Sequence, residues 1–299
     1  MTNLINEFNL NNIPFISEEP MSLHTSFKTG GKAQVFVDVD NADSLGRVLK
    51  ICDENNKDVF ILGKGSNLLV SDDGIRDRVV IHLTTDFSAM KLIDETTVEV
   101  EAGASLASLC KFALANSLTG LEFAYGIPGS CGGAAYMNAG AYGGEMKDVI
   151  VKVNHIDKKG NAGSFSGDEL KFSYRKSAYT DSDLVITSLV IKLEKGDKAE
   201  IEEKMTDIMG RRVAKQPLEY PSAGSVFKRP EGYFAGALIE QSGLKGQRIG
   251  GAMVSEKHAG FIINYDSATT TDVINLIRHC QKTVSDKFGV SLETEIKFV

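Results

Sequence analysis

Apolar residues in the first two-thirds of the chain switch between the spacing of a strand and that of a helix. Residues 35–39 alternate apolar and polar side chains, and residues 41–55 carry Leu45, Val48 and Leu49 on one face of a helix. A second predicted helix carries Leu106, Leu109, Cys110 and Ala113. Further strands are predicted at residues 59–62, 79–83, 97–101, 149–156 and 184–193. This alternation indicates a protein of mixed α and β structure.

The last third of the chain has its own pattern and forms a further predicted unit. It follows the charged stretch 194–198 and opens with a helix that carries Ile201, Met205, Ile208 and Met209. The elements predicted after it are a helix at 233–241, a strand at 260–264, a helix at 271–288 and a terminal segment at 295–299. No internal repeat of about 20 to 50 residues indicates a solenoid.

Length and composition limit the class of protein. At 299 residues the chain exceeds one typical core, so two or three subdomains are expected. The content of 42% hydrophobic and 24% charged residues is ordinary for a globular protein. No apolar run approaches ~18 residues, and the polar N-terminus lacks the features of a secretion signal. We therefore expect a cytoplasmic enzyme with no membrane segment.

Charge and cysteine content exclude further classes. The net charge of −7 argues against nonspecific nucleic-acid binding, so any anionic ligand must be held by a local group of cations. The cysteines, of which three fall on apolar positions of predicted helices, are scattered without a CxxC pair; they are Cys52, Cys110, Cys131 and Cys280. We interpret them as reduced packing residues, with neither a metal site nor a disulfide.

Glycine is concentrated in residues 126–140, where five of fifteen residues are glycine. Clustered glycine costs conformational entropy on folding, so such a stretch indicates backbone with positive φ or backbone in contact with a large ligand. A cofactor is one such ligand. A Gly/Ala-rich loop or a close helix crossing is the structural alternative.

A second glycine loop, GKGSN at residues 63–67, follows the predicted strand 59–62. Its backbone amides can converge on a phosphate, and the side chains of Ser66 and Asn67 add donors. The spacing fits neither GxxxxGK[ST] nor GxGxxG, which would need glycine at Leu68. The loop is a phosphate site or a plain tight turn, and two such loops in one domain favour the phosphate site.

Arg175 lies in the segment FSYRKS, at what we expect to be the edge of a strand. An arginine at such a place is commonly a surface residue. A buried guanidinium, however, is well suited to hold a carboxylate through two hydrogen bonds.

Two clusters in the last third carry further candidate chemistry. Ser225 lies on a small-residue turn between two prolines in residues 221–230. Residues 211–229 carry five cations against one acid, which suits a diphosphate; the cations are Arg211, Arg212, Lys215, Lys228 and Arg229. The first three could instead complement the C-terminal end of their helix. In a strand Glu293 and Glu295 would share a face that points into a cleft or into solvent.

The order of the motifs closely resembles that of the UDP-N-acetylenolpyruvoylglucosamine reductases, the MurB-type flavoenzymes of bacterial cell-wall synthesis. The match runs from about Met21 to the C-terminus. The motifs are KTGG at 28–31, GKGSN at 63–67, GIPGSCGGAAYMNAGAYGGE at 126–145, FSYRKS at 172–177, PSAGSVFKRP at 221–230, RIGGA at 248–252, SEKHAGFIIN at 255–264 and LETEI at 292–296. Several of them are long enough to make a chance agreement remote.

The resemblance implies the fold and its division. The expected class is α+β, with a two-subdomain FAD-binding fold of the PCMH or vanillyl-alcohol-oxidase type and a C-terminal α+β substrate-binding domain. The implied ranges are 1–84 and 85–196 for the FAD-binding subdomains and 197–292 for the substrate-binding domain. Residues 293–299 are expected to return to the second subdomain.

The resemblance also implies the site residues. Arg175 would grip the substrate carboxylate, Ser225 would donate a proton, and Glu295, the second acid of the ExE pair, would act beside them. The residues implied for noncovalent FAD are Gly63, Lys64, Gly65, Ser66, Asn67, Ile127, Pro128, Gly129, Ser130, Gly132, Gly133 and Ala134. The residues implied for the UDP-sugar are Arg212, Gln216, Lys228 and Arg229.

The implied reaction explains these residue types. NADPH reduces FAD and leaves, and the enolpyruvyl ether then receives hydride at C3 to give UDP-N-acetylmuramate. Negative charge accumulates on the substrate carboxylate, where Arg175 stabilises it. Ser225 protonates C2, and we hypothesise that Lys228 lowers the barrier to this transfer. The implied partners are small molecules, without nucleic acid or membrane, and the protein is expected to be a monomer.

Some residues depart from the family pattern. Cys131 stands where an aliphatic residue is common, and Arg229 where many relatives have asparagine. The short distance along the chain between Arg175 and Ser225 leaves little room for the tyrosine-bearing lid loop of one branch, so we assign the chain to the shorter branch with a more open cleft.

Two other functions stay open, an alcohol or lactone oxidase that uses FAD and a nonenzymatic nucleotide-sugar binding protein. The oxidase does not explain the arginine, serine and glutamate set, and the binding protein does not explain the glycine loops.

Overall fold

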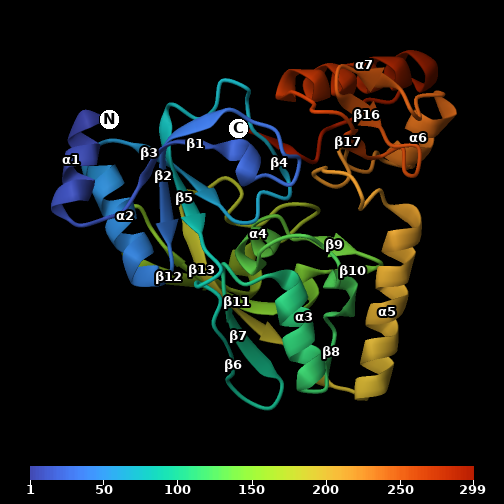
Figure 1. Cartoon of the computed structure of the whole chain (residues 1–299). Helices are drawn as coiled ribbons and strands as arrows, with labels where there is room; N and C mark the ends of the chain where they lie inside the picture. Colours follow the sequence, from blue (N-terminus) through green and yellow to red (C-terminus); the bar gives the residue numbers. More distant parts are fainter. The chain divides into compact units, whose positions relative to one another are not determined.

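The computed structural model describes residues 1–299 and divides them into two compact units. Unit 1 consists of Met1–Ser17, Val35–Lys64 and Asp77–Arg211, and unit 2 consists of Glu18–Gln34, Gly65–Arg76 and Arg212–Val299. Each unit has its own buried hydrophobic core. Figure 1 labels the α-helices and most of the strands.

Unit 1 contains a sheet with parallel strands. Strands β2 (Lys32–Val39) and β3 (Asp58–Leu62) both pair in parallel with β5 (Arg78–Leu83), in a sheet of order β1-β2-β5-β3 in which β1 is Ile16–Pro20. The last three residues of β1 and the first three of β2 are assigned to unit 2. Helix α2 (Ala42–Glu54) connects β2 to β3, as parallel strands require a crossover. The helix and strands predicted at these positions are confirmed.

Helix α2 shows why its boundaries follow from the sequence. The side chain of Asn41 accepts a hydrogen bond from the Ser44 backbone N–H at 2.8 Å, and the Ser44 hydroxyl caps the Asn41 backbone in return. This capping box satisfies amides that have no partner inside the helix.

The second sheet of unit 1 is antiparallel and has the order β12-β11-β13-β7-β6. Its strands are β6 (Met90–Leu92), β7 (Thr97–Glu101), β11 (Ile150–Ile156), β12 (Ala162–Ser166) and β13 (Val185–Lys192). The helices of this unit are α1 (Thr2–Leu10), α2, α3 (Leu106–Ala115), α4 (Cys131–Tyr136) and α5 (Lys198–Lys215), whose last residues belong to unit 2. Short strand pairs join β9 (Gly140–Ala141) to β10 (Gly144–Glu145) and β8 (Leu118–Thr119) to β14 (Glu194–Lys195).

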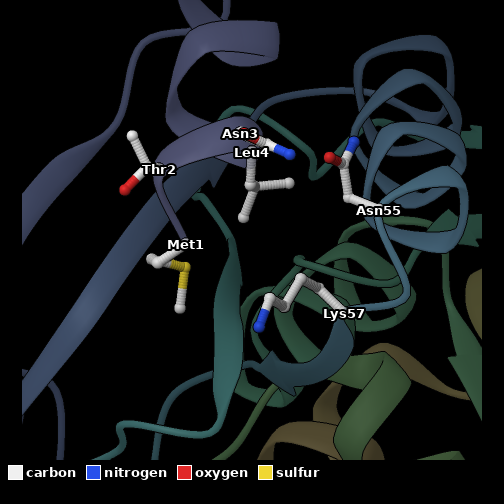
Figure 2. A pocket seen from close by; sticks show the side chains of 6 residues that line it. All are labelled: Met1, Thr2, Asn3, Leu4, Asn55 and Lys57. Carbon is white, nitrogen blue, oxygen red and sulfur yellow. The ribbon is translucent and has the colours of Figure 1, made fainter.

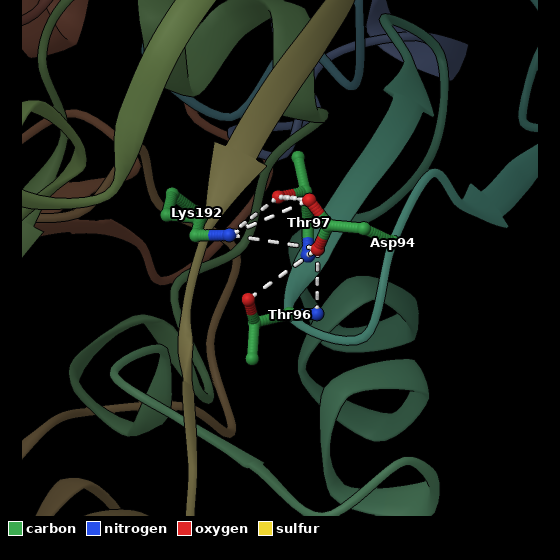
Figure 3. Close-up of polar contacts among 4 residues, drawn as sticks. All are labelled: Asp94, Thr96, Thr97 and Lys192. Carbon is green, nitrogen blue, oxygen red and sulfur yellow. Dashed lines mark hydrogen bonds and ion pairs between the residues drawn. The ribbon is translucent and has the colours of Figure 1, made fainter.

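A polar turn closes the β6–β7 hairpin (Figure 3). The Asp94 carboxylate accepts hydrogen bonds from the backbone N–H groups of Thr96 and Thr97 and from the Thr97 hydroxyl, each at 2.8 Å. Lys192 Nζ lies 3.5 Å from the same carboxylate. Hydrogen bonds from Thr96 and Thr97 hold the pKa of Asp94 below its usual value. These contacts stabilise the turn, and none of its residues is a predicted site residue.

Unit 2 is a small α+β layer structure. An antiparallel sheet of order β15-β16-β17 contacts helix α7, and α7 contacts α6, as seen at the orange and red end of the chain in Figure 1. The elements are α6 (Ala235–Gln241), β15 (Arg248–Ile249), β16 (Ala252–Val254), β17 (Ile262–Asn264) and α7 (Thr270–Phe288). In addition, β4 (Leu68–Leu69) pairs in parallel with β18 (Lys297–Phe298). The segment after the GKGSN loop thus belongs to the same unit as the C-terminal residues.

The two longest helices each bury one face. Helix α7 buries Val273, Ile277, Cys280 and Val284, and it ends at Gly289, whose φ of 67° suits glycine. None of the helices combines the length and the hydropathy that a membrane span requires.

Some elements differ from their predicted form. Helix α1 has no predicted counterpart, and α6 begins at Ala235 rather than at 233. The C-terminal segment forms only a two-residue strand, so Glu293 and Glu295 do not lie in one regular strand. That strand pairs with β4 and not with residues 85–196, because Lys297 N–H bonds the Asn67 carbonyl and Val299 N–H bonds the Leu69 carbonyl. The expected return of residues 293–299 to the second FAD subdomain is therefore wrong.

Candidate active site

The two glycine loops meet inside unit 1. A Cβ atom placed on Gly63 would lie 2.4 Å from Ser130 Oγ, a distance that real side chains do not tolerate. Glycine is therefore favoured at position 63 because the Ser130 hydroxyl of the second loop lies directly against its backbone. Ser130 is almost completely buried and caps α4, with its hydroxyl accepting from Gly133 N–H at 3.3 Å. The juxtaposition supports a shared role for the loops.

The second loop is laid against the segment that follows β7. The Leu106 N–H donates to the Gly129 carbonyl at 3.1 Å, and the Gly132 N–H donates to the Ala102 carbonyl at 2.9 Å. A Cβ on Gly132 would lie 2.8 Å from the Cβ of Ala102. The loop is thus held by backbone contacts on one side.

Cys131 is the first residue of α4 and has no exposed surface. Burial raises the pKa of its thiol far above the usual range, Cys110 raises it further, and Lys64 lowers it in part. The other cysteines are also buried and free, and burial raises the pKa values of Cys52 and Cys280 to about 12. A buried neutral thiol is a poor nucleophile, which disfavours attachment of a cofactor at Cys131.

Arg175 lies on a tight turn and not, as predicted, at the edge of a strand. Ser173 and Lys176 exchange both backbone hydrogen bonds, so Tyr174 and Arg175 form the tip. Arg175 has φ of 58°, in the left-handed region that non-glycine residues rarely adopt. Its guanidinium lies 5.0 Å from the centre of the Tyr174 ring and donates to the Gly140 carbonyl at 3.2 Å. Strained residues of this kind concentrate at binding and catalytic sites.

In unit 2 the GKGSN loop is bonded to the C-terminal segment. Asn67 Nδ2 donates to the Glu295 carbonyl at 3.2 Å, and the Lys297 N–H donates to the Asn67 carbonyl at 2.9 Å. A Cβ on Gly65 would lie 2.0 Å from the His24 carbonyl oxygen, so the loop also packs against the segment before KTGG. Three motifs that are distant in the sequence therefore meet at this loop.

Ser225 and Glu295 lie on neighbouring stretches of unit 2. The Glu295 N–H donates to the carbonyl of Val226 at 2.7 Å, and Phe227 forms a bridge with Thr294. Ser225 forms a bridge with Phe261, and its hydroxyl donates to the Phe227 carbonyl at 3.3 Å. The structure therefore brings the predicted proton donor and the predicted acid into adjacent positions of the backbone.

His258 was not among the predicted site residues, although its motif SEKHAGFIIN was identified. Its Nδ1 accepts from the Gly260 N–H at 3.1 Å, and a Cβ on Gly260 would lie 3.0 Å from the His258 ring and 3.4 Å from Ser225 Oγ. Burial lowers the pKa of His258. A histidine close to a serine in space, but distant in the sequence, gives no signal in the spacing of the motifs.

The two cations of the PSAGSVFKRP motif, Lys228 and Arg229, already have partners in the protein. Lys228 Nζ lies 2.9 Å from the Glu293 carboxylate, so Glu293 and Glu295 have different surroundings. Arg229 is exposed, with its guanidinium 4.0 Å from the centre of the Phe234 ring. Both side chains lie on the surface of unit 2 near Ser225 in the sequence.

The cations of α5 divide into two kinds. Arg211 is exposed, lies 3.3 Å from Asp207 and stacks over Tyr142 at 4.6 Å, within unit 1. Arg212 is only 4% exposed. It continues the buried stripe of Ile201, Met205 and Ile208 at helical spacing. The last turn of α5 carries Arg212 and Lys215 but not Arg211, so the helix-end explanation applies only to those two residues, of which Arg212 is a buried charge. Gln216 follows the helix, is partly buried, and donates its N–H to the Arg212 carbonyl.

A pocket of about 300 Å³ lies elsewhere, at the N-terminus of α1 (Figure 2). It is lined by Met1, Thr2, Asn3, Leu4, Asn55 and Lys57. None of these residues belongs to a glycine loop or to a predicted catalytic motif. No group of three or more histidine, cysteine, aspartate or glutamate side chains is arranged to hold a metal ion.

The glycine loops have the chemistry to hold FAD. Gly63 and Gly65 leave the backbone without side chains in a crowded place, and Lys64 adds an exposed cation between them. Ser66 and Asn67 add polar side chains. Backbone amides, hydroxyls and one cation fit a pyrophosphate. Of the remaining residues predicted for FAD, Ile127, Pro128 and Gly129 are at least partly exposed, and Ala134 is buried.

Comparison with known protein families agrees with this arrangement. Residues 33–165 match the FAD binding domain family, and residues 216–299 match the C-terminal domain of UDP-N-acetylenolpyruvoylglucosamine reductase. The first range contains both glycine loops, and the second contains Ser225 and Glu295.

Whole-chain comparisons give the same family. The chain is 51% identical over 281 residues to the UDP-N-acetylenolpyruvoylglucosamine reductase of Caldanaerobacter subterraneus subsp. tengcongensis, covering 94% of this chain and 92% of the relative. It is 48% identical to the enzyme of that name from Listeria innocua, covering 94% and 93%.

Solved structures extend the comparison to the fold. The crystal structure of the UDP-N-acetylenolpyruvylglucosamine reductase from Thermus caldophilus matches with a TM-score of 0.80 and 35% identity over 96% of this chain and 98% of that chain. Berberine bridge enzyme from Eschscholzia californica matches with a TM-score of 0.51 and 17% identity over 65% of this chain and 44% of that chain, which shows a common fold alone. The predicted α+β fold class with an FAD-binding domain is confirmed. The chain belongs to the UDP-N-acetylenolpyruvoylglucosamine reductase family.

Proposed function

We propose that this chain reduces the enolpyruvyl ether of UDP-N-acetylglucosamine to UDP-N-acetylmuramate, with NADPH as the electron donor and FAD as the cofactor. The observation that carries the proposal is the position of Glu295 in unit 2, between the GKGSN loop and the Ser225 turn. The Asn67 side chain donates to the Glu295 carbonyl, and the Glu295 N–H donates to the carbonyl of Val226, the residue after Ser225. An enzyme that protonates a substrate beside its cofactor requires this proximity. Family membership supports the same activity.

The glycine loops would hold FAD. Residues 63–67, with the Lys64 ammonium, would contact the pyrophosphate, and residues 127–134 would line the rest of the cofactor. When bound, FAD supplies the chemistry of hydride transfer from NADPH to C3 of the enolpyruvyl group. As in the predicted division, residues 1–84 and 85–196 would serve the cofactor, and residues 197–292 would serve the UDP-sugar.

Noncovalent attachment of FAD is part of this proposal. The thiol of Cys131 is buried and its pKa is raised, so it is a poor nucleophile toward the flavin. Acid precipitation should therefore release all flavin into the supernatant. Yellow colour retained in the denatured pellet would contradict noncovalent binding.

Arg175 would bind the carboxylate of the enolpyruvyl group. Its guanidinium is permanently charged and planar, and it can form two parallel hydrogen bonds with a carboxylate. Reduction at C3 places negative charge on that carboxylate. The arginine stabilises this charge more strongly than it stabilises the ground state, which lowers the barrier.

Ser225 would donate the proton to C2. A serine is a weak acid, but the carbanion at C2 is very basic, and a positioned hydroxyl can transfer a proton to it. Glu295, held one residue from Ser225 across the backbone pairing, would orient or supply a proton at the same end. The bond between Lys228 and Glu293 gives the lysine a partner and argues against a main role in activating Ser225.

The UDP-sugar would be held by the cations of unit 2. Arg229 is exposed and its guanidinium lies over the Phe234 ring, whereas the Glu293 carboxylate partly neutralises the charge of Lys228. We expect Arg229 to contribute more to diphosphate binding than Lys228. Arg212 and Gln216 are proposed as further contacts.

The protein is also proposed to act as a monomer in the cytoplasm, where nucleotide sugars and NADPH are made. Light scattering after size exclusion tests the monomer. A mass near twice that of the 32.4 kDa chain would contradict it.

Turnover with the natural substrate tests the proposed function. Purified protein should oxidise NADPH only when the enolpyruvyl UDP-sugar is present, and the product should be heavier than the substrate by about 2 mass units, for one hydride and one proton. NADPH oxidation that depends on oxygen and not on the sugar would identify an oxidase instead.

A further inference from the structure

Asn138 is a fully buried polar residue in the motif that links the glycine loop to β9 and β10. Its φ is 46°, a left-handed conformation that asparagine tolerates better than most residues. Asn138 has no role in the chemical steps of the reaction proposed for this chain. A buried amide is costly unless its hydrogen-bonding groups are satisfied, so its partners indicate what it does.

The Asn138 side chain connects three segments of unit 1. Nδ2 donates to Glu145 Oε2 at 2.7 Å and to the Ser173 carbonyl at 3.0 Å, and Oδ1 accepts from the Lys147 N–H at 2.9 Å. Both amide protons are used. The orientation of the amide is therefore fixed by its partners.

The bond to Ser173 fixes the backbone of the turn that presents Arg175. Ser173 closes that turn through its paired hydrogen bonds with Lys176. Arg175 occupies the strained position of the turn, with φ of 58°. An anchor on the closing residue keeps this conformation populated, because strain persists only where surrounding contacts hold it.

The bonds from Asn138 to Glu145 and Lys147 hold the β9–β10 hairpin, which contacts the guanidinium of Arg175. Glu145 pairs with Gly140 across the β9–β10 ladder. The Gly140 carbonyl accepts from Arg175 Nη2 at 3.2 Å. One amide thus holds both the turn from which Arg175 projects and the hairpin that contacts its guanidinium.

We propose that Asn138 is a positioning residue for Arg175 and sets the direction in which the guanidinium meets the substrate carboxylate. This inference rests on the proposed function of Arg175. Asparagine is required because its Nδ2 group must donate two hydrogen bonds, one to the Glu145 carboxylate and one to the Ser173 carbonyl. Aspartate has the same shape but presents an acceptor to both.

The variant Asn138→Asp turns this donor into a pH-dependent group. At high pH its carboxylate faces that of Glu145 and the Ser173 carbonyl. The charged groups around the pair are Lys147, which bonds Glu145, together with Asp148 and Arg175. As pH falls, two adjacent carboxylates share a proton, and the O–H restores one donor.

The test measures reoxidation of the reduced holoenzyme by the enolpyruvyl UDP-sugar, after anaerobic reduction with dithionite. Relative to wild type at each pH, we expect Asn138→Asp to be slower by about 10- to 100-fold at pH ~8 and to recover several-fold toward pH ~6. Asn138→Gly keeps the left-handed backbone but loses all three bonds, so it should be slow without recovery. The double variant N138D/E145Q removes the second carboxylate and should lose the pH dependence.

Matched controls separate positioning from a loss of structure. Asn154, on β11, also donates to a carboxylate, that of Glu99, at 3.5 Å, and to Ser188 at 2.8 Å. Asn154→Asp should leave the reoxidation rate and its pH profile unchanged. Bound flavin and the thermal midpoint report whether each variant folds. If Asn138→Asp does not fold, Asn138→Gly takes its place in the test.

A double-mutant cycle that combines the Asn138 variants with Arg175→Lys separates the role of Asn138 from that of Arg175. If Asn138 acts through Arg175, substitution of Asn138 should slow reoxidation little further once Arg175 has been replaced. Additive losses in the cycle, or wild-type reoxidation in both Asn138 variants, would overturn the inference while leaving the function of Arg175 intact. Normal reoxidation in Arg175→Lys and in Arg175→Ala would instead overturn the proposed role of the arginine itself.

Discussion

Substitution of Gly63 tests the contact between the two glycine loops. In Gly63→Ala the new methyl group would lie 2.4 Å from Ser130 Oγ, whereas the next atom, Ser130 Cβ, is 3.4 Å away. Only the hydroxyl is in conflict. Overpacking of this kind costs about 1–3 kcal/mol, because the loops must move apart. The substitution should destabilise unit 1 by that amount and weaken FAD binding.

Removal of the hydroxyl should relieve the conflict. Ser130→Ala alone loses the cap that accepts from Gly133 N–H, at a cost of about 1 kcal/mol. In the double variant the methyl group fits, so its total loss should be smaller than the sum of the single losses by about 1–2 kcal/mol. The assays are chemical unfolding of the apoprotein and FAD titration by fluorescence quenching, where each 1.4 kcal/mol is about tenfold in affinity.

A second glycine provides the control. A Cβ on Gly210, in α5, would meet no atom within 4 Å. Gly210→Ala should be neutral or stabilise by up to about 1 kcal/mol, since alanine favours a helix. Additive effects of Gly63→Ala and Ser130→Ala would show that the loops are not in contact and would refute the reasoning.

Three further predictions address the site and the fold. Ser225→Ala should bind FAD and accept electrons from NADPH normally, but rapid mixing should show reoxidation by the substrate slowed by about 10²–10⁴, the contribution of a general acid; a normal rate would mean that another group supplies the proton. Arg229→Glu should raise the KM for the UDP-sugar without changing NADPH-dependent flavin reduction, and an equal loss of flavin would refute the assignment. Burial raises the pKa of Asp72, but hydrogen bonds from Thr271 and Thr270 outweigh burial and leave the pKa lowered, so its stabilisation is present above pH ~4 and is lost as the pH falls further. Asp72→Ala should therefore cost about 1 kcal/mol at pH 7 and flatten the acid limb in urea unfolding, and an unchanged limb would contradict this.

Much of the fold follows from local patterns. Helix α2 lies within one residue of its predicted range at each end because Leu45, Val48 and Leu49 recur at helical spacing, and a capping box of Asn41 and Ser44 fixes its start. Strand β7 matches its predicted range, Thr97–Glu101, since its apolar residues alternate. Periodicity and capping involve neighbours in the chain, so they are visible without the structure.

The division into units depends on contacts that local patterns do not contain. Residues 65–76 belong to unit 2 because Asp72 binds the first amides of α7, at Thr270 and Thr271, and β4 pairs with β18. These partners lie about two hundred positions away in the sequence. Spacing within a motif carries no information about such pairing.

The candidate site was predictable in its residue types but not in its geometry. Arg175 was expected at the edge of a strand, beside the aromatic and hydroxyl residues of the segment FSYRKS. The observed turn is held by the pairing of Ser173 with Lys176 and by the side chain of Asn138, a residue of another segment. The resemblance supplied the names of the site residues, and the structure supplied the contacts that hold them.

Anaerobic flavin spectroscopy tests the proposed reductase activity in a single experiment. The purified protein should be yellow, its absorbance at about 450 nm should bleach with NADPH, and the enolpyruvyl UDP-sugar should restore it without oxygen. Restoration by the sugar at one equivalent per flavin is the result expected for the proposed reductase. Colour that returns only when oxygen is admitted, with the sugar inert, would contradict the account.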